Sequence, residues 1–117
     1  MAKKTIMVVD DEQDIRTTVE TVLKVAGYAV ITAVSGDDCL AKLKKAKPDL
    51  ILMDIMMPGT PVRQVVKQIK GIKIAYLSVV RVSEAEKEEL LGDNIVDFIQ
   101  KPFDIGELLK RVKKLVG

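Results

Sequence analysis

Short apolar runs alternate along the chain with longer segments in which apolar residues recur every three to four positions. The runs have the length of buried strands, and the longer segments have the period of amphipathic helices. Five runs predict strands, at Ile6–Val9, Ala29–Ala33, Leu50–Met53, Ile74–Leu77 and Val96–Ile99. Strict alternation of strand and helix predicts an α/β fold, in which a parallel sheet is covered by helices on both faces.

The segments that separate or follow these runs predict five helices. Apolar residues share one helical face from Ile15 to Ala26, from Val62 to Ile69 and from Ile105 to Val116. Two weaker patterns predict a second helix around Asp37–Ala46 and a fourth around Ser83–Leu91. Each crossover is long enough for one helix, as parallel strands require.

Residues that favour helix ends support these boundaries. Thr60-Pro61 predicts an N-cap followed by proline at the first helical position. Ser83 with Glu86, and Asp104 with Glu107, have the spacing of a capping box. Three glycines stand where a helix would end in a left-handed residue: Gly27, Gly71 and Gly92.

The length and composition are those of one folded domain. A chain of 117 residues, 48% apolar and 31% charged, predicts a single domain over residues 1–117. A net charge of +2 gives no reason to expect direct contact with nucleic acid or a membrane surface. The chain opens without a signal-peptide core, and no apolar run approaches the roughly 20 residues that span a bilayer. We therefore expect a cytoplasmic protein.

The residue types restrict the metals that this chain could bind. It contains no histidine and one cysteine, Cys39, which leaves almost no ligands for structural zinc and no internal disulfide. A hard cation bound by oxygen atoms is the expected metal.

Carboxylates end two of the predicted strands. Ile6–Val9 runs into Asp10 and Asp11, and Leu50–Met53 runs into Asp54. In a doubly wound sheet of the flavodoxin-like order 2-1-3-4-5, a three-layer α/β/α arrangement, the ligand site lies between the ends of the first and third strands. The three carboxylates should converge there in an acidic pocket for a cation.

Two further polar residues follow strands at this edge, and together the set resembles a known family. Ser78 follows the fourth strand and Lys101-Pro102-Phe103 follows the fifth, while Met53-Asp54-Ile55-Met56-Met57-Pro58-Gly59 surrounds the end of the third. With Asp10-Asp11, these motifs resemble the receiver domain of two-component response regulators over the whole chain. The resemblance covers the fold as well as the site.

The resemblance implies a role for each site residue. Asp54 would accept a phosphoryl group, Lys101 would supply its counter-charge, and Ser78 would sense the group through a hydroxyl hydrogen bond. A Mg²⁺ site would be formed at four positions: Asp10, Asp11, Asp54 and Met56. Carboxylates suit Mg²⁺, and phosphoryl transfer needs the charge on the phosphoryl oxygens neutralised.

The resemblance also implies partners and a switch. The donor would be a sensor histidine kinase or a phosphotransfer protein, and the only catalysis would be the domain's own phosphorylation and dephosphorylation. In receivers, Ser78 and an aromatic residue of the fifth strand, here Phe98, rearrange the surface formed by helix four, strand five and helix five. Phe98 lacks a hydroxyl, so that only its packing can report its rotamer. The chain ends at Gly117, soon after the last predicted helix, and we expect its output to be the binding of an effector protein.

Departures from the usual receiver pattern leave one alternative open. Gly59-Thr60-Pro61-Val62 stands where the family normally runs toward Asp-Gly, and Val79 stands where a small residue is usual. The stiff proline would make the third helix begin earlier and more rigidly, and Val79 would crowd the path by which a phosphodonor reaches Asp54. A degenerate receiver, which binds partners without being phosphorylated, therefore remains an alternative.

Two other functions on similar sheets lack residues that they need. A phosphohydrolase with an aspartyl-phosphate intermediate typically carries a second acid two residues after its nucleophile, where this chain has Met56. A flavin carrier needs a phosphate loop after the first strand, and Asp10-Asp11 would repel a phosphate there.

Overall fold

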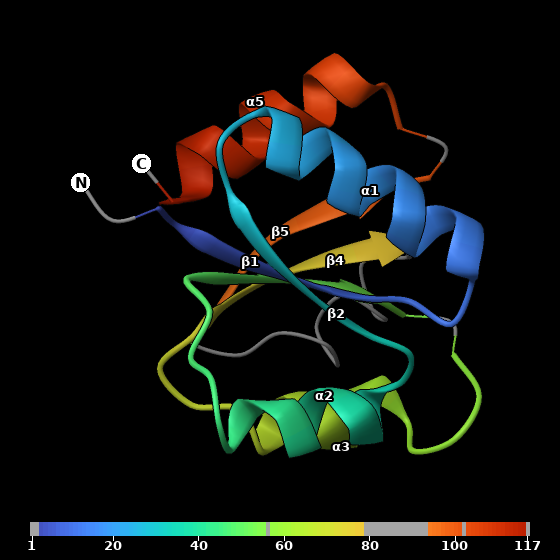
Figure 1. Ribbon diagram of the computed structural model, residues 1–117. Coiled ribbons are helices and arrows are strands. Elements are labelled where there is room, and N and C mark those ends of the chain that lie inside the picture. Colours follow the sequence, from blue (N-terminus) through green and yellow to red (C-terminus); the bar gives the residue numbers. More distant parts are fainter. Residues whose placement is uncertain (1–2, 56, 79–93, 102, 117) are drawn as a thin grey trace.

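A parallel sheet of five strands runs through the centre of the molecule (Figure 1). The computed structural model describes residues 3–55, 57–78, 94–101 and 103–116. The strands are β1 (Thr5–Val9), β2 (Ala29–Ala33), β3 (Leu50–Asp54), β4 (Lys73–Ser78) and β5 (Ile95–Gln100). Their order across the sheet is β2-β1-β3-β4-β5, and every neighbouring pair is parallel. The predicted strands and their order are confirmed.

Four helices cover the sheet in the described ranges. They are α1 (Gln13–Val25), α2 (Gly36–Leu43), α3 (Val62–Lys67) and α5 (Ile105–Val116). Figure 1 shows α1 and α5 on one face of the sheet and α2 and α3 on the other. The predicted fourth helix, Ser83–Leu91, its capping pair and Gly92 lie outside the described residues. None of the helices described has the length and apolar character needed to cross a membrane.

The strands supply alternate residues to two separate cores because successive side chains of a strand point to opposite faces. On β1, Met7 and Val9 pack with Val65 on the α2–α3 side, while Ile6 and Val8 pack on the α1–α5 side. All five residues of β3 are buried, as expected for a strand covered on both faces. The core therefore fixes the central strands, which carry the acidic residues at their ends.

The beginning of α3 differs from the prediction. Thr60 is not the N-cap, because α3 begins at Val62 and Pro61 occupies the capping position without a side-chain cap. The Thr60 hydroxyl instead donates to the carboxylate of Asp37, 2.9 Å from Oδ1 and 3.1 Å from Oδ2. Thr60 thus ties the loop after β3 to the first turn of α2. Within the altered Gly59-Thr60-Pro61 sequence, Thr60 therefore has a structural role.

The other predicted caps have mixed outcomes. Asp104 accepts a hydrogen bond from the backbone N–H of Glu107 at 3.2 Å, which confirms this cap of α5. Gly27 follows the C-cap of α1 with a φ of 101°, as predicted. Gly71 also has a positive φ, 73°, but α3 ends at Lys67, and Gly71 therefore belongs to the following turn and not to the helix end.

Helices α2 and α3 approach closely at Gly36. This residue opens α2, and a Cβ atom placed on it would lie 2.5 Å from Cγ2 of Val65 on α3. Ser35, immediately before it, caps α2 by accepting from the backbone N–H of Asp38 at 3.0 Å. Only glycine fits this approach without a shift of Val65. The packing of α2 on α3 therefore depends on having glycine, which has no side chain, at position 36.

Candidate functional site

Three carboxylates meet at the carboxyl edge of the sheet. Oxygen atoms of Asp10, Asp11 and Asp54 lie within 4.8 Å of one another. Asp10 has 0% of its surface exposed and Asp54 has 3%, whereas Asp11 is exposed. This arrangement is the acidic pocket that the strand ends predict. The pocket is therefore open to solvent at Asp11 and closed at Asp10 and Asp54.

Backbone contacts hold Asp10 at this position. Its N–H donates to the carbonyl of Ala33 at 3.1 Å, which continues the β1–β2 pairing one residue past the strand. Its Oδ1 accepts from the N–H of Glu12 at 2.9 Å, and its carbonyl accepts from Arg16 at 2.8 Å. The Asp10 side chain is therefore oriented by the turn that leads into α1.

Lys101 places a positive charge among these acids. Its Nζ lies 2.5 Å from Oδ2 of Asp10 and 3.6 Å from Oδ2 of Asp54. Only 5% of the residue is exposed, so that the ammonium group takes its partners from the protein. A buried lysine needs such partners because an unpaired charge is costly to remove from water. The position of Lys101 is thus set by the two buried carboxylates.

Ser78 ends β4 beside this cluster. It is 6% exposed, and its carbonyl accepts from the N–H of Lys101 at 2.6 Å. Leu77, one residue earlier, is paired with Asp54 across the β3–β4 ladder. The backbone therefore brings Ser78 to the same edge as Lys101 and Asp54. Met56, Val79 and Pro102, which the sequence also singles out here, lie outside the described residues.

The residues fit a small, hard cation. Carboxylate oxygens are the ligands that Mg²⁺ prefers, and it usually keeps several waters, which the exposed side at Asp11 allows. Three carboxylates opposed by the single charge of Lys101 leave an excess of negative charge within this cluster. A bound divalent cation would replace the repulsion between the three carboxylates with attraction to the ion. The pocket has both the donors and the charge for such an ion.

Phe98 packs against an aromatic neighbour on β4. Its ring centroid lies 5.2 Å from that of Tyr76, with the two planes tilted by 43°. Phe98 is partly buried against the α2–α3 core, whereas Tyr76 is fully buried. Burial raises the pKa of the Tyr76 phenol to about 12. Phe98, the candidate switch residue, thus packs against the buried and uncharged ring of Tyr76.

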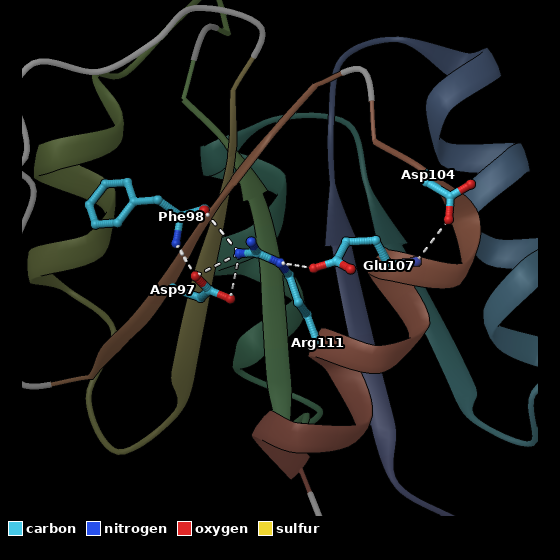
Figure 2. A network of polar contacts seen from close by, with 5 residues as sticks. All are labelled: Asp97, Phe98, Asp104, Glu107 and Arg111. Atoms are coloured by element: carbon cyan, nitrogen blue, oxygen red, sulfur yellow. Dashed lines mark hydrogen bonds and ion pairs between the residues drawn. The ribbon is translucent and has the colours of Figure 1, made fainter.

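A polar network ties the backbone of Phe98 to α5 (Figure 2). Arg111 lies 3.0 Å from both oxygens of Asp97 and also donates to the carbonyl of Phe98 at 3.3 Å. Its Nε donates to Glu107 at 3.0 Å. The hydrogen bond that the guanidinium of Arg111 donates to Glu107, together with the charge of Asp97, raises the pKa of this guanidinium. Strand β5 and helix α5 are therefore linked next to Phe98.

Three of these contributors, Arg16, Asp97 and Arg111, were missing from the sequence-based site. Arg16 has no signal of its own, because an arginine in the first turns of a helix is usually solvated. Asp97 interrupts an apolar strand, and Glu107 with Arg111 has the i, i+4 spacing of a helical ion pair. Those two features could have predicted the network, although not that Arg111 reaches both acids.

Comparison with solved structures defines the class of protein. The chemotaxis protein CheY4 of Vibrio cholerae superposes with a TM-score of 0.86 at 33% identity, covering 97% of this chain and 99% of that one. A CheY-like receiver domain protein of Methanospirillum hungatei gives a TM-score of 0.87 at 34% identity, covering 99% and 96%. The chain is therefore a CheY-like α/β protein.

Sequence comparison gives the family. The model of the response regulator receiver domain matches residues 6–113. The chain belongs to this family, whose members act in two-component signalling. It is 36% identical over 116 residues to the alkaline phosphatase synthesis transcriptional regulatory protein PhoP of Bacillus subtilis, covering 97% of this chain. The chain spans 48% of the length of that regulator, about half.

Membership in the family has general consequences. Receiver domains bind Mg²⁺ at an acidic pocket and interact with histidine kinases and effectors, and they are generally not enzymes in the strict sense. In this chain the corresponding acidic cluster is formed by Asp10, Asp11 and Asp54.

Proposed function

We propose that this domain accepts a phosphoryl group on Asp54 from a sensor histidine kinase or a phosphotransfer protein in the cytoplasm. The observation that carries the proposal is the convergence of Asp54 with Asp10, Asp11 and the buried Lys101 at one edge of the sheet. The transfer is a displacement at phosphorus. A carboxylate oxygen of Asp54 forms the new P–O bond while the bond to the donor breaks.

The neighbouring side chains position this reaction and stabilise its charge. Lys101, already 3.6 Å from Asp54, supplies a positive charge to the phosphoryl oxygens. Asp10, Asp11 and Asp54 would hold Mg²⁺, with Met56 as a further contributor. When bound, Mg²⁺ neutralises the negative charge that builds up on the transferred group. Asp10 is held by Glu12 and Arg16 and therefore needs little rearrangement to act.

The signal leaves the site through Ser78 and Phe98 in this proposal. The Ser78 hydroxyl donates to a phosphoryl oxygen, an interaction that exists only after modification. Phosphorylation therefore favours the arrangement in which Ser78 and Lys101 contact the group. Phe98 packs on Tyr76, and its backbone is tied to Arg111, so that a change of its rotamer would alter the β5–α5 surface. An effector protein binds the β5–α5 surface in one of its two arrangements.

The test is intact-protein mass spectrometry after incubation with acetyl phosphate and Mg²⁺. The expected result is a single phosphoryl adduct that is absent when a chelator removes the metal. The Asp54→Asn variant should give no adduct, while Asp49→Asn, which changes a carboxylate at the opposite end of β3, should be modified like the unaltered chain.

Two results would contradict the proposal. An adduct that persists in Asp54→Asn would place the modification elsewhere. No adduct, together with no beryllofluoride complex, would favour the degenerate receiver that binds partners without phosphorylation.

A further inference from the structure

A cleft lies at the edge of the sheet opposite to the acid cluster. Its volume is about 290 Å³. Its lining comes from the residue before β1, the turn between α1 and β2, and α5: Lys4, Ala26, Tyr28, Leu109, Lys113 and Val116. Figure 1 shows the beginning of β1 and the end of α5 close together at this edge. We call it the amino-edge cleft, because β1 and β2 begin here, whereas Asp10 and Asp54 lie at the carboxyl edge of the sheet.

The lining combines apolar walls with positive charge. Leu109, Lys113 and Val116 are spaced along α5 at the intervals that share one helical face. Tyr28, Leu109 and Val116 are only partly buried, so that their apolar atoms remain accessible from the cleft. Lys4 and Lys113 are exposed, and none of the described residues that line the cleft is acidic. The cleft is therefore apolar inside and cationic at its rim.

We propose that the amino-edge cleft binds a small amphipathic anion, namely a carboxylate attached to an aromatic ring by a short chain. The two ammonium groups would contact the carboxylate, and the ring would pack on Tyr28 and Leu109. The volume, about 290 Å³, is just below the roughly 300 Å³ at which the usual range for ligand pockets begins, which suits a ligand as small as one ring and a short chain.

This site is independent of the phosphorylation proposed above. The acid cluster attracts cations at the carboxyl ends of the strands, whereas the amino-edge cleft attracts anions at the amino ends. Binding at the cleft should consequently persist in Asp54→Asn and in the absence of Mg²⁺. Failure of one proposal therefore leaves the other untouched.

The experiment is an NMR titration of the ¹⁵N-labelled full chain with 3-phenylpropionate, up to about 20 mM. For a ligand of this size we expect a dissociation constant on the order of 1 mM, with shifts centred on the amides of Lys4, Tyr28 and Lys113. Acetate, which lacks the ring, and 3-phenyl-1-propanol, which lacks the charge, should each bind at least about fivefold more weakly.

A matched pair of double variants tests the two lysines. Lys4→Gln/Lys113→Gln should weaken binding of 3-phenylpropionate by about fivefold or more while leaving that of the alcohol unchanged. The control, Lys45→Gln/Lys47→Gln, removes the same charge from exposed positions outside the lining and should have no effect. The proposal is overturned by shifts that do not saturate, by shifts centred elsewhere, by equal binding of the acid and the alcohol, or by equal losses in the two double variants.

Discussion

The ammonium nitrogen of Lys101 lies 2.5 Å from Oδ2 of Asp10, and both residues are buried. They are separated by 91 positions in the chain, so that this ion pair connects the first strand to the segment after the last. Breaking a buried ion pair by removing one partner leaves the other charge without compensation. Lys101 therefore compensates the buried charge of Asp10 as well as forming part of the site.

Replacing Lys101 with Met should destabilise the protein at neutral pH. The change leaves Asp10 and Asp54 buried without their cation, and we expect a loss of about 3 kcal/mol in the free energy of unfolding. Urea denaturation followed by circular dichroism would measure it. Lys47→Met, at an exposed position, should change the free energy by no more than about 0.5 kcal/mol. A loss of similar size in both variants would mean that the pair is not specifically stabilising.

Mg²⁺ should raise the melting temperature of the unmodified protein, because it relieves the repulsion between Asp10, Asp11 and Asp54. Asp11→Asn should reduce this increase, since it removes one carboxylate of the cluster. Thermal unfolding at several Mg²⁺ concentrations, with a chelator as reference, measures the effect. Asp14→Asn, in the first turn of α1, keeps all three carboxylates and should respond like the original chain. Equal responses of the two variants would argue against this metal site.

The contact between Asp97 and Arg111 should stabilise the β5–α5 packing by a modest amount. Both side chains are partly exposed, so that solvent screening limits their coupling to about 0.5–1 kcal/mol. A double-mutant cycle with Asp97→Asn and Arg111→Met, measured by urea denaturation, gives this coupling directly. The same cycle with Asp97→Asn and Lys110→Met should give none. A zero value for the first cycle would mean that Figure 2 shows a contact without energetic weight.

Gly36→Ala should destabilise the packing of α2 on α3. The new methyl group would lie 2.5 Å from Cγ2 of Val65, a stiff β-branched side chain, and overpacking of this kind costs about 1–3 kcal/mol. Adding Val65→Ala makes room, so that the double variant should be more stable than the sum of the two single losses predicts. If the losses of the two single variants simply add in the double variant, the contact with Val65 is not the reason that position 36 requires glycine.

Cys39 should make the protein less stable in alkali. Burial, with a smaller contribution from the charge of Asp38, raises the pKa of the Cys39 thiol from 9.0 to about 12. The unfolded chain therefore loses this proton first, and the free energy of unfolding falls as the pH rises from about 9 toward 12, by at most about 1.4 kcal/mol per pH unit. Urea denaturation at a series of pH values should show a shallower decline for Cys39→Ala. Identical slopes would contradict the assignment.

The sequence predicted the central sheet well because the signals there are local. Each strand is a continuous apolar run, and Asp10 and Asp54 follow two of these runs directly. Once the strands are parallel and ordered, those acids have to meet at one edge. The position of the acidic pocket therefore follows from the sequence alone.

The features that the sequence missed depend on partners far along the chain. Thr60 looked like an N-cap, but its hydroxyl bonds to Asp37, 23 positions earlier. Asp97 lies inside a predicted strand, and its partner, Arg111 of α5, is 14 positions later in the chain. These side-chain partners are brought together by the tertiary fold, and local sequence patterns therefore do not predict them.

The alternation of β1 between two cores has a consequence for changes in chain length. Met7 and Val9 face one helical layer, and Ile6 and Val8 face the other. Deleting a single residue from this strand would exchange the two sets and also bring Asp10 to the place of Val9, away from Lys101. Insertions and deletions in β1 should therefore be tolerated only when two residues are added or removed, or not at all. A substitution by a residue of similar size leaves each side chain of β1 facing the same core.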